Sequence, residues 1–178
     1  MQSVTRYVET RLRLQVNESK SAVGRPWDRK FLGFTFTNSR TAPKVRIHWK
    51  TIKRFRERVR ELTCRTRGRS LSQVIAELNR YITGWWQYYC LTDSVNRLRP
   101  LAHWVRRRLR ALVWKQWKNR RTRVQNLLKC GLSRQSALTT GCARKGPWRM
   151  SIVKWVVLAL PDQHFHSLGL SFPWLPPA

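Results

Sequence analysis

Apolar residues recur every three or four positions through most of this chain, and this spacing constrains the fold more than any other feature. After Thr51 the repeat comprises Ile52, Phe55, Val59 and Leu62, while lysine and arginine fill the other positions. Such a repeat places the apolar side chains on one face of an α-helix. A chain of 178 residues can bury a substantial core between helices of this kind. The sequence therefore predicts a mainly α fold.

The stretch LNRYITGWWQYYC, residues 78–90, raises the question of whether its rings stack on bases or form a helical core. Ser70 and Gln73 have the spacing of a capping box, which predicts the start of a helix ahead of it. At 100° per residue, one tight stripe comprises Leu78, Ile82, Trp85 and Tyr89, with Trp86 on one flank and Tyr81 and Tyr88 on the other. We expect the stripe to be core and Tyr81 and Tyr88 to border the surface.

A long basic helix is predicted from about Pro100, since proline is tolerated in the first turn. Its buried stripe would comprise Leu101, Val105, Leu109 and Leu112, and its other faces would carry cations as far as Arg121. Trp114 falls on the basic side. Both Trp114 and Trp117 suit either a core position or base stacking.

The tail predicts shorter elements. A helix should end at Gly131 and be followed by one capped by a serine. The segment ARKGPWR, residues 143–149, predicts a loop with a turn at Gly146 and Pro147, and Trp148 is expected to dock the tail onto the core.

The first fifty residues have a different pattern. Tyr7 to Gln15 predicts a short helix, and KFLGFTF, residues 30–36, predicts a strand. A second strand, KVRIHW, residues 44–49, follows the turn-prone TNSRTAP. The expected fold class is a mainly helical domain preceded by a small α+β segment with a β-hairpin.

The charge balance points to a polyanionic partner. There are 37 lysines and arginines against 8 acids, a formal net charge of +29. This balance favours nucleic acid, although ribosomal and membrane-surface proteins are also basic. The start of the chain has no secretory signal pattern, and the apolar run 152–160 is too short to span a bilayer. We expect a cytoplasmic protein with no membrane partner.

Enzymatic chemistry has little support in the sequence. Asp28, Asp93 and Asp162 are isolated from one another, so no carboxylate pair for two metal ions is evident. The four cysteines form no C-x-x-C pair, and the histidines complete no zinc-finger spacing. We expect no catalytic residues, no metal site and no cofactor.

Cations in three segments are the candidates for RNA contact. They lie in the loop RTRGRS, on the long helix, and around GPWR, where few acids can pair with them. Tyr88 is added because it borders the surface of its helix. The candidates are Arg65, Arg67, Arg69, Arg106, Arg107, Arg110, Lys115, Lys118, Arg121, Arg144, Lys145, Arg149 and Tyr88.

The order of these segments resembles a known family. The segments LRLQVNESKS and KFLGFTF, then a basic helix, LNRYITGWWQYY, WVRRRLRALVWKQWK and GPWR, are together similar to the C-terminal part of bacterial group II intron reverse transcriptases, or maturases. The resemblance covers nearly the whole chain. Each piece is weak alone, and the set in this order is specific.

This resemblance implies two parts. Residues 1–49 would be a remnant of the polymerase palm, with Lys20 as the late-palm lysine and Phe31, Leu32, Gly33 and Phe34 as the primer-grip strand. Residues 50–178 would be the helical thumb, or maturase-specific domain X. Such a domain would hold group II intron RNA, other structured RNA or template-primer.

The sequence departs from the family pattern in ways that bear on polymerase activity. The family's Tyr-x-Asp-Asp aspartates lie upstream of the lysine segment, so this chain should not polymerise DNA alone. Arg80 stands where many members have proline, which would let the helix continue. Two alternatives to an RNA-binding maturase domain remain: one half of a split reverse transcriptase that needs an upstream partner, or a decayed fragment.

Overall fold

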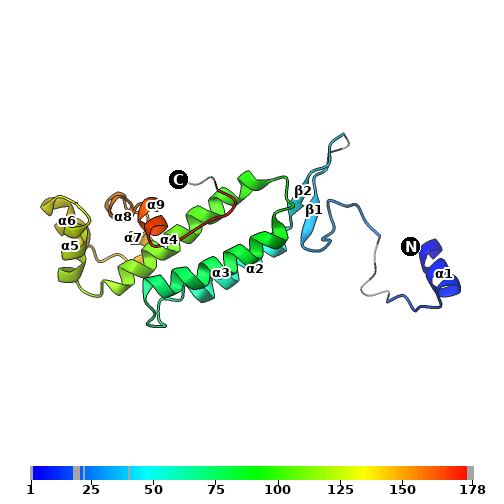
Figure 1. Ribbon diagram of the computed structural model, residues 1–178, viewed down its shortest axis with the longest axis horizontal. Helices are drawn as coiled ribbons and strands as arrows, with labels where there is room; N and C mark the ends of the chain where they lie inside the picture. The colour runs from blue at the N-terminus through cyan, green and yellow to red at the C-terminus, as the bar shows by residue number, and fades with distance from the viewer. Residues whose placement is uncertain (1, 18–20, 22, 40, 176–178) are drawn as a thin grey trace.

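The computed structural model describes residues 2–17, 21, 23–39 and 41–175, and it is mainly α-helical, as predicted. Its body is built on three long helices: α2 (Trp49–Leu62), α3 (Leu71–Tyr89) and α4 (Arg99–Gln116). A two-stranded hairpin lies at one end of these helices, and α5 and α6 lie at the other (Figure 1). Helix α1 (Gln2–Arg11) lies apart from this body and has no buried residues.

The predicted starts of α3 and α4 are confirmed by the structure. Ser70 accepts a hydrogen bond from the backbone N–H of Gln73, whose side chain accepts one from the N–H of Ser70. The α3 helix then runs unbroken through Arg80. Pro100 lies in the first turn of α4, after the 3₁₀ turn η1 (Val95–Leu98). Local sequence therefore determines where these helices begin.

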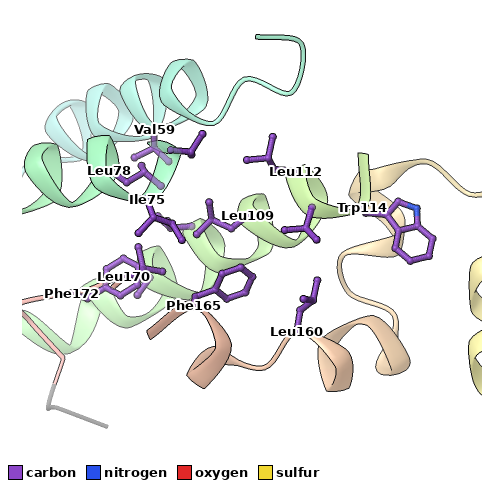
Figure 2. Packing of buried hydrophobic residues seen from close by; sticks show 14 of the residues in the cluster. Val59, Ile75, Leu78, Leu109, Leu112, Trp114, Leu160, Phe165, Leu170 and Phe172 are labelled. Carbon is purple, nitrogen blue, oxygen red and sulfur yellow. The ribbon is translucent and has the colours of Figure 1, made fainter. Parts of the chain in front are cut away.

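The core lies where α2, α3 and α4 meet the C-terminal segment. Figure 2 shows side chains from α2 and α3 converging with those of α4, and Phe165, Leu170 and Phe172 closing the same core from the C-terminal side. The predicted α4 stripe is buried throughout: Leu101, Val105, Leu109 and Leu112 are at most 3% exposed. Burial of this stripe accounts for the apolar repeat in the sequence.

The C-terminal segment completes the core through short helices and a returning tail. These are α7 (Pro147–Met150), α8 (Lys154–Ala159) and α9 (Asp162–Ser167). The Asn79 side chain of α3 donates to the carbonyl of Gly169 (2.6 Å) and accepts from the N–H of Ser171 (3.1 Å). The tail is thereby held against α3, and Trp174 is buried.

The aromatic stretch of α3 is therefore mainly structural. Trp85 lies 4.7 Å from Phe55 of α2 between ring centres, and 4.8 Å from Tyr89. Trp174 packs against both Trp85 and Trp86. The predicted division holds only in part: Leu78 and Ile82 are fully buried and Tyr88 is half exposed, but Trp85 and Tyr89 are partly buried, as is Tyr81.

The long basic helix is shorter than expected. It ends at Gln116, and α5 (Arg120–Lys129) begins after a break in which Asn119 accepts a hydrogen bond from the N–H of Thr122. The interpretation of one helix as far as Arg121 is wrong, because the asparagine cap begins a new helix. Trp114 is fully buried, so the core alternative is correct for it.

The remaining tail predictions are mostly confirmed. Gly131, with a φ of +84°, follows α5, and Ser133 caps α6 (Arg134–Gly141). The segment around Trp148 differs from expectation. It is a helical turn, because Gly146 and Pro147 begin α7 instead of a loop.

The predicted hairpin is present but shorter than expected. Strand β1 (Phe34–Phe36) pairs antiparallel with β2 (Val45–Ile47). Phe31 and Phe34 instead exchange backbone hydrogen bonds across a turn of Leu32 and Gly33, both with positive φ. Type I′ two-residue turns require positive φ at both central residues. Near the N-terminus, the predicted helix Tyr7–Gln15 is displaced: α1 ends at Arg11.

Within the described residues, no group of acids, histidines and cysteines is arranged to hold a metal ion, and no helix is long and apolar enough to cross a membrane. All four cysteines are free thiols.

Candidate nucleic-acid interface

A row of arginines crosses the surface between α2 and α4. Arg56 and Arg60 are four residues apart on α2, and Trp104 and Arg108 are four apart on α4, so each pair shares a helix face. The guanidinium carbons of Arg56, Arg60 and Arg108 lie 5.9, 5.7 and 5.4 Å from the centre of the Trp104 ring. One indole thus holds three cations together. We call Arg56, Arg60, Trp104 and Arg108, with Arg65 and Arg67, the α2–α4 track.

Arg108 is fixed within this track by neutral partners. Its Nε donates to the hydroxyl of Thr63 (2.6 Å), and its Nη2 donates to the carbonyl of Arg60 (3.4 Å). Burial lowers the pKa of Arg108, and the positive charges of Arg65 and Arg60 lower it further. No carboxylate among the described residues pairs with Arg108, so a bound anion would stabilise its charge.

The loop between α2 and α3 extends the track. Arg65 and Arg67, two of the predicted phosphate contacts, are exposed there, and Gly68 makes the turn with a φ of +65°. Cys64 lies beside Thr66, with its thiol 3.2 Å from the hydroxyl. That hydrogen bond lowers the pKa of the Cys64 thiol, and the charges of Arg67 and Arg108 also lower it. Arg69 differs, because it pairs with Glu77 of α3.

Two predicted RNA contacts are buried structural groups. Arg106 and Arg110 both pair with Asp162 of α9, at 3.0 and 2.8 Å, and their side chains are 6% and 11% exposed. Arg110 also donates to the carbonyl of Leu160 (2.9 Å). Burial lowers the pKa of Arg110, and the nearby Asp162 carboxylate opposes that shift. Both arginines are therefore buried, and they anchor the C-terminal segment to α4.

Cations near α7 form a second exposed group. The Arg107 guanidinium carbon lies 3.8 Å from the centre of the Trp148 ring, and its Nη2 donates to the Trp148 carbonyl (3.4 Å). Trp148 thus docks α7 onto α4, in keeping with its expected role. The exposed cations of this segment are Arg144, Lys145 and Arg149.

The other predicted cations lie at the far end of α4 and on α5. Lys115, Lys118 and Arg121 are exposed. Their neighbour Arg123 lies over the Trp114 ring at 5.0 Å and donates to the Trp117 carbonyl (2.9 Å). Arg123 therefore joins α5 to the end of α4, while the three exposed cations face solvent.

The primer-grip-like residues meet the end of α3. The hydroxyl of Tyr88 donates to the carbonyl of Leu32 (3.1 Å), and the Phe34 ring lies 5.2 Å from that of Tyr89. Tyr88 thus contacts the turn through its hydroxyl. Phe31 and Leu32 are exposed at 68% and 65%. Lys20 lies outside the described residues.

The sequence interpretation missed the centre of the track. Arg56, Arg60 and Arg108 were noted only as cations on outer helix faces. The i, i+4 spacing of Arg56 with Arg60, and of Trp104 with Arg108, was an available signal. The packing of α2 beside α4 had no signal in the local sequence, because it depends on tertiary contacts.

The matched family covers most of this surface. Residues 52–131 match the family model described as "Group II intron, maturase-specific domain", and the match includes the whole α2–α4 track. A search of curated proteins finds no match to the chain. Residues 52–131 are thus similar to the maturase-specific domain of group II introns.

Proposed function

We propose that this protein binds group II intron RNA and stabilises its folded, splicing-competent form, without supplying catalytic groups itself. The observation that carries the proposal is the α2–α4 track, in which three guanidinium groups surround Trp104 with no carboxylate partner among the described residues. Such groups bind phosphates and release counterions from RNA. A maturase-specific domain is expected to associate with intron RNA, which agrees with this surface.

The proposed contacts come from three places. The track supplies Arg56, Arg60, Arg65, Arg67 and Arg108. The cations near α7 supply Arg107, Arg144, Lys145 and Arg149, and the far end of α4 with α5 supplies Lys115, Lys118 and Arg121. Arg69 would contribute less to RNA binding because it is paired with Glu77. Tyr88 would contribute indirectly, by supporting the turn at Leu32. The division into a palm remnant at 1–49 and a thumb domain at 50–178 stays a prediction.

A filter-binding titration tests this function. The protein is titrated against a group II intron RNA and a scrambled RNA of equal length at several salt concentrations. About six phosphate contacts give a log–log slope of affinity against salt of roughly −4 to −5. The intron should bind more tightly than the scrambled RNA. Equal affinity for both would reduce the function to general polyanion binding, and a salt-independent curve would contradict the proposal.

One observation favours the second candidate, half of a split reverse transcriptase. The hairpin exposes apolar side chains, with Phe31 at 68%, Leu32 at 65% and Phe36 at 37%. Exposed apolar side chains of this kind suit contact with a protein partner. Under this alternative, mixing the chain with a polypeptide that carries Tyr-x-Asp-Asp would give primer extension that neither piece shows alone. No extension by the mixture would exclude it.

A further inference from the structure

A pocket of about 980 Å³ lies where the hairpin meets α2, η1 and the start of α4. Its walls include Phe36 and Arg46 from the two strands, Trp49 and Lys53 from α2, and Arg97 from η1. These elements meet at the hairpin end of the long helices (Figure 1).

The pocket is strongly cationic. Arg46, Lys53, Arg56, Arg60 and Arg97 line it, whereas Asp28 is the one acid among the described lining residues. The Nε of Arg46 is buried and has no hydrogen-bond partner among the residues that the structure describes. A buried donor without a partner is costly, and a charged one more so. An acceptor on a ligand would remove that cost, so the pocket is suited to an anion.

The pocket also contains aromatic and polar side chains, which binding of a simple anion would not require. Trp27, Phe36 and Trp49 contribute ring surface, and Trp49 is 63% exposed. Asn38 and Ser94 add side chains that can donate and accept hydrogen bonds. Cations beside exposed rings and amide groups are the combination by which proteins hold an unpaired base and its phosphate. The volume suits a nucleotide unit better than a phosphate alone.

The pocket is continuous with the α2–α4 track. Arg56 and Arg60 line the pocket and also lie within 6 Å of the Trp104 ring centre. A ligand in the pocket can therefore be part of the same strand whose phosphates follow the track. Paired bases inside an RNA duplex are not free to enter a pocket, whereas bulged and looped bases are.

We propose that this pocket captures an unstacked nucleotide of the bound RNA, with the base against Trp49 and its phosphate at Arg46. The inference rests on the proposed RNA binding and deepens it: the track supplies general affinity, and the pocket selects RNA that carries an unpaired base beside a helix. Recognition would thus depend on RNA shape.

Two matched RNA hairpins test the pocket, one fully paired and one with a single bulged adenosine. Wild-type protein should bind the bulged hairpin about five- to a hundredfold more tightly, the range expected for one stacked base. Arg46→Gln and Trp49→Leu should each abolish the preference while retaining affinity for the paired hairpin. Arg67→Gln, in the track but outside the pocket, should weaken both RNAs and keep the preference.

Each outcome is decisive. Equal binding of the two hairpins by the wild type overturns the proposal for the pocket but leaves the proposed RNA binding in place. Failure to bind either hairpin overturns both proposals. A preference that survives Arg46→Gln and Trp49→Leu shows that bulge recognition lies elsewhere. Circular dichroism of each variant establishes that it is folded, and Lys53→Gln on the exposed face of α2 gives a third pocket variant if either fails.

Discussion

Gly33 lies so close to Tyr89 that a methyl group on its Cα would stand 2.6 Å from the tyrosine hydroxyl oxygen. Thr51 closes the same space: its hydroxyl donates to the Gly33 carbonyl (2.9 Å), as does the N–H of His48. The φ of Gly33 is +89°. The turn of the primer-grip-like segment is thus held against α2 and α3 at a position where only glycine fits.

Gly33→Ala should therefore destabilise the protein by about 1–3 kcal/mol, through the contact with Tyr89 and the strained backbone. Gly84→Ala is the matched control. Gly84 lies within α3 with no atom near its missing Cβ, so alanine there should stabilise by about 0.5–1 kcal/mol. Urea unfolding measures both. Equal effects of the two substitutions would show that the turn is not held as described.

Asp162→Asn should cost about 1–3 kcal/mol of unfolding free energy. It removes the ion pairs to Arg106 and Arg110 and leaves two buried guanidinium groups with reduced compensation. Glu61→Gln breaks the exposed pair with Arg58, whose side chains are both 54% exposed, and should cost less than about 1 kcal/mol. Thermal or urea unfolding compares them. An Asp162→Asn effect no larger than that of Glu61→Gln would exclude the anchoring role.

Acid should weaken the protein partly through His48. Burial lowers the pKa of His48 from its ordinary value of 6.5, and the charges of Lys30 and Lys50 lower it further. Above pH 6.5 the ring is mainly neutral in both states. As the pH falls from 6.5 toward the lower folded pKa, the unfolded chain takes up the proton first, so the free energy of unfolding decreases.

His48→Asn should reduce this loss of stability at acid pH. The His48 ring accepts the N–H of Lys50 at the start of α2, and asparagine can replace that acceptor without titrating. Urea unfolding at about pH 8 and about pH 5 measures the difference. The variant should lose less stability on acidification than the wild type, and equal losses would show that His48 does not carry the effect.

The thiol of Cys64 should report RNA on the track. Its hydrogen bond to Thr66 lowers its pKa, and Arg67 and Arg108 add to that effect. A phosphate bound to these arginines would raise the pKa of the Cys64 thiol and slow its alkylation by up to about tenfold. Mass spectrometry after N-ethylmaleimide treatment measures each cysteine, with Cys130, the residue that follows α5, as the internal control. Unchanged Cys64 alkylation with saturating RNA would place the RNA elsewhere.

The helices were largely predictable because their signals are local. The apolar repeat of α2, the capping box at Ser70 and the first-turn Pro100 each depend on neighbouring residues. The break between α4 and α5 was missed because basic and aromatic residues continue across it. Its signal was local but was overlooked: Asn119 caps α5.

The candidate site was only partly predictable because its charges are redistributed by tertiary contacts. Nothing near Arg106 and Arg110 in the sequence indicates that Asp162, more than fifty residues later, pairs with both. Conversely, Trp104 gathers arginines from two helices whose packing the sequence does not specify. The exposed loop residues Arg65 and Arg67 were predictable, because nothing in the local sequence could bury them.

The central claim is that RNA follows the α2–α4 track, and a pair of charge-matched double variants tests it most directly. Arg56→Gln/Arg60→Gln removes two cations from the track. Arg54→Gln/Arg80→Gln removes two exposed cations outside it, from α2 and α3. The measurement is affinity for a group II intron RNA as a function of salt. The track variant should bind more weakly and lose about 1.5 units of log–log salt slope, while the other retains nearly the wild-type slope. Equal losses in the two double variants would contradict the account.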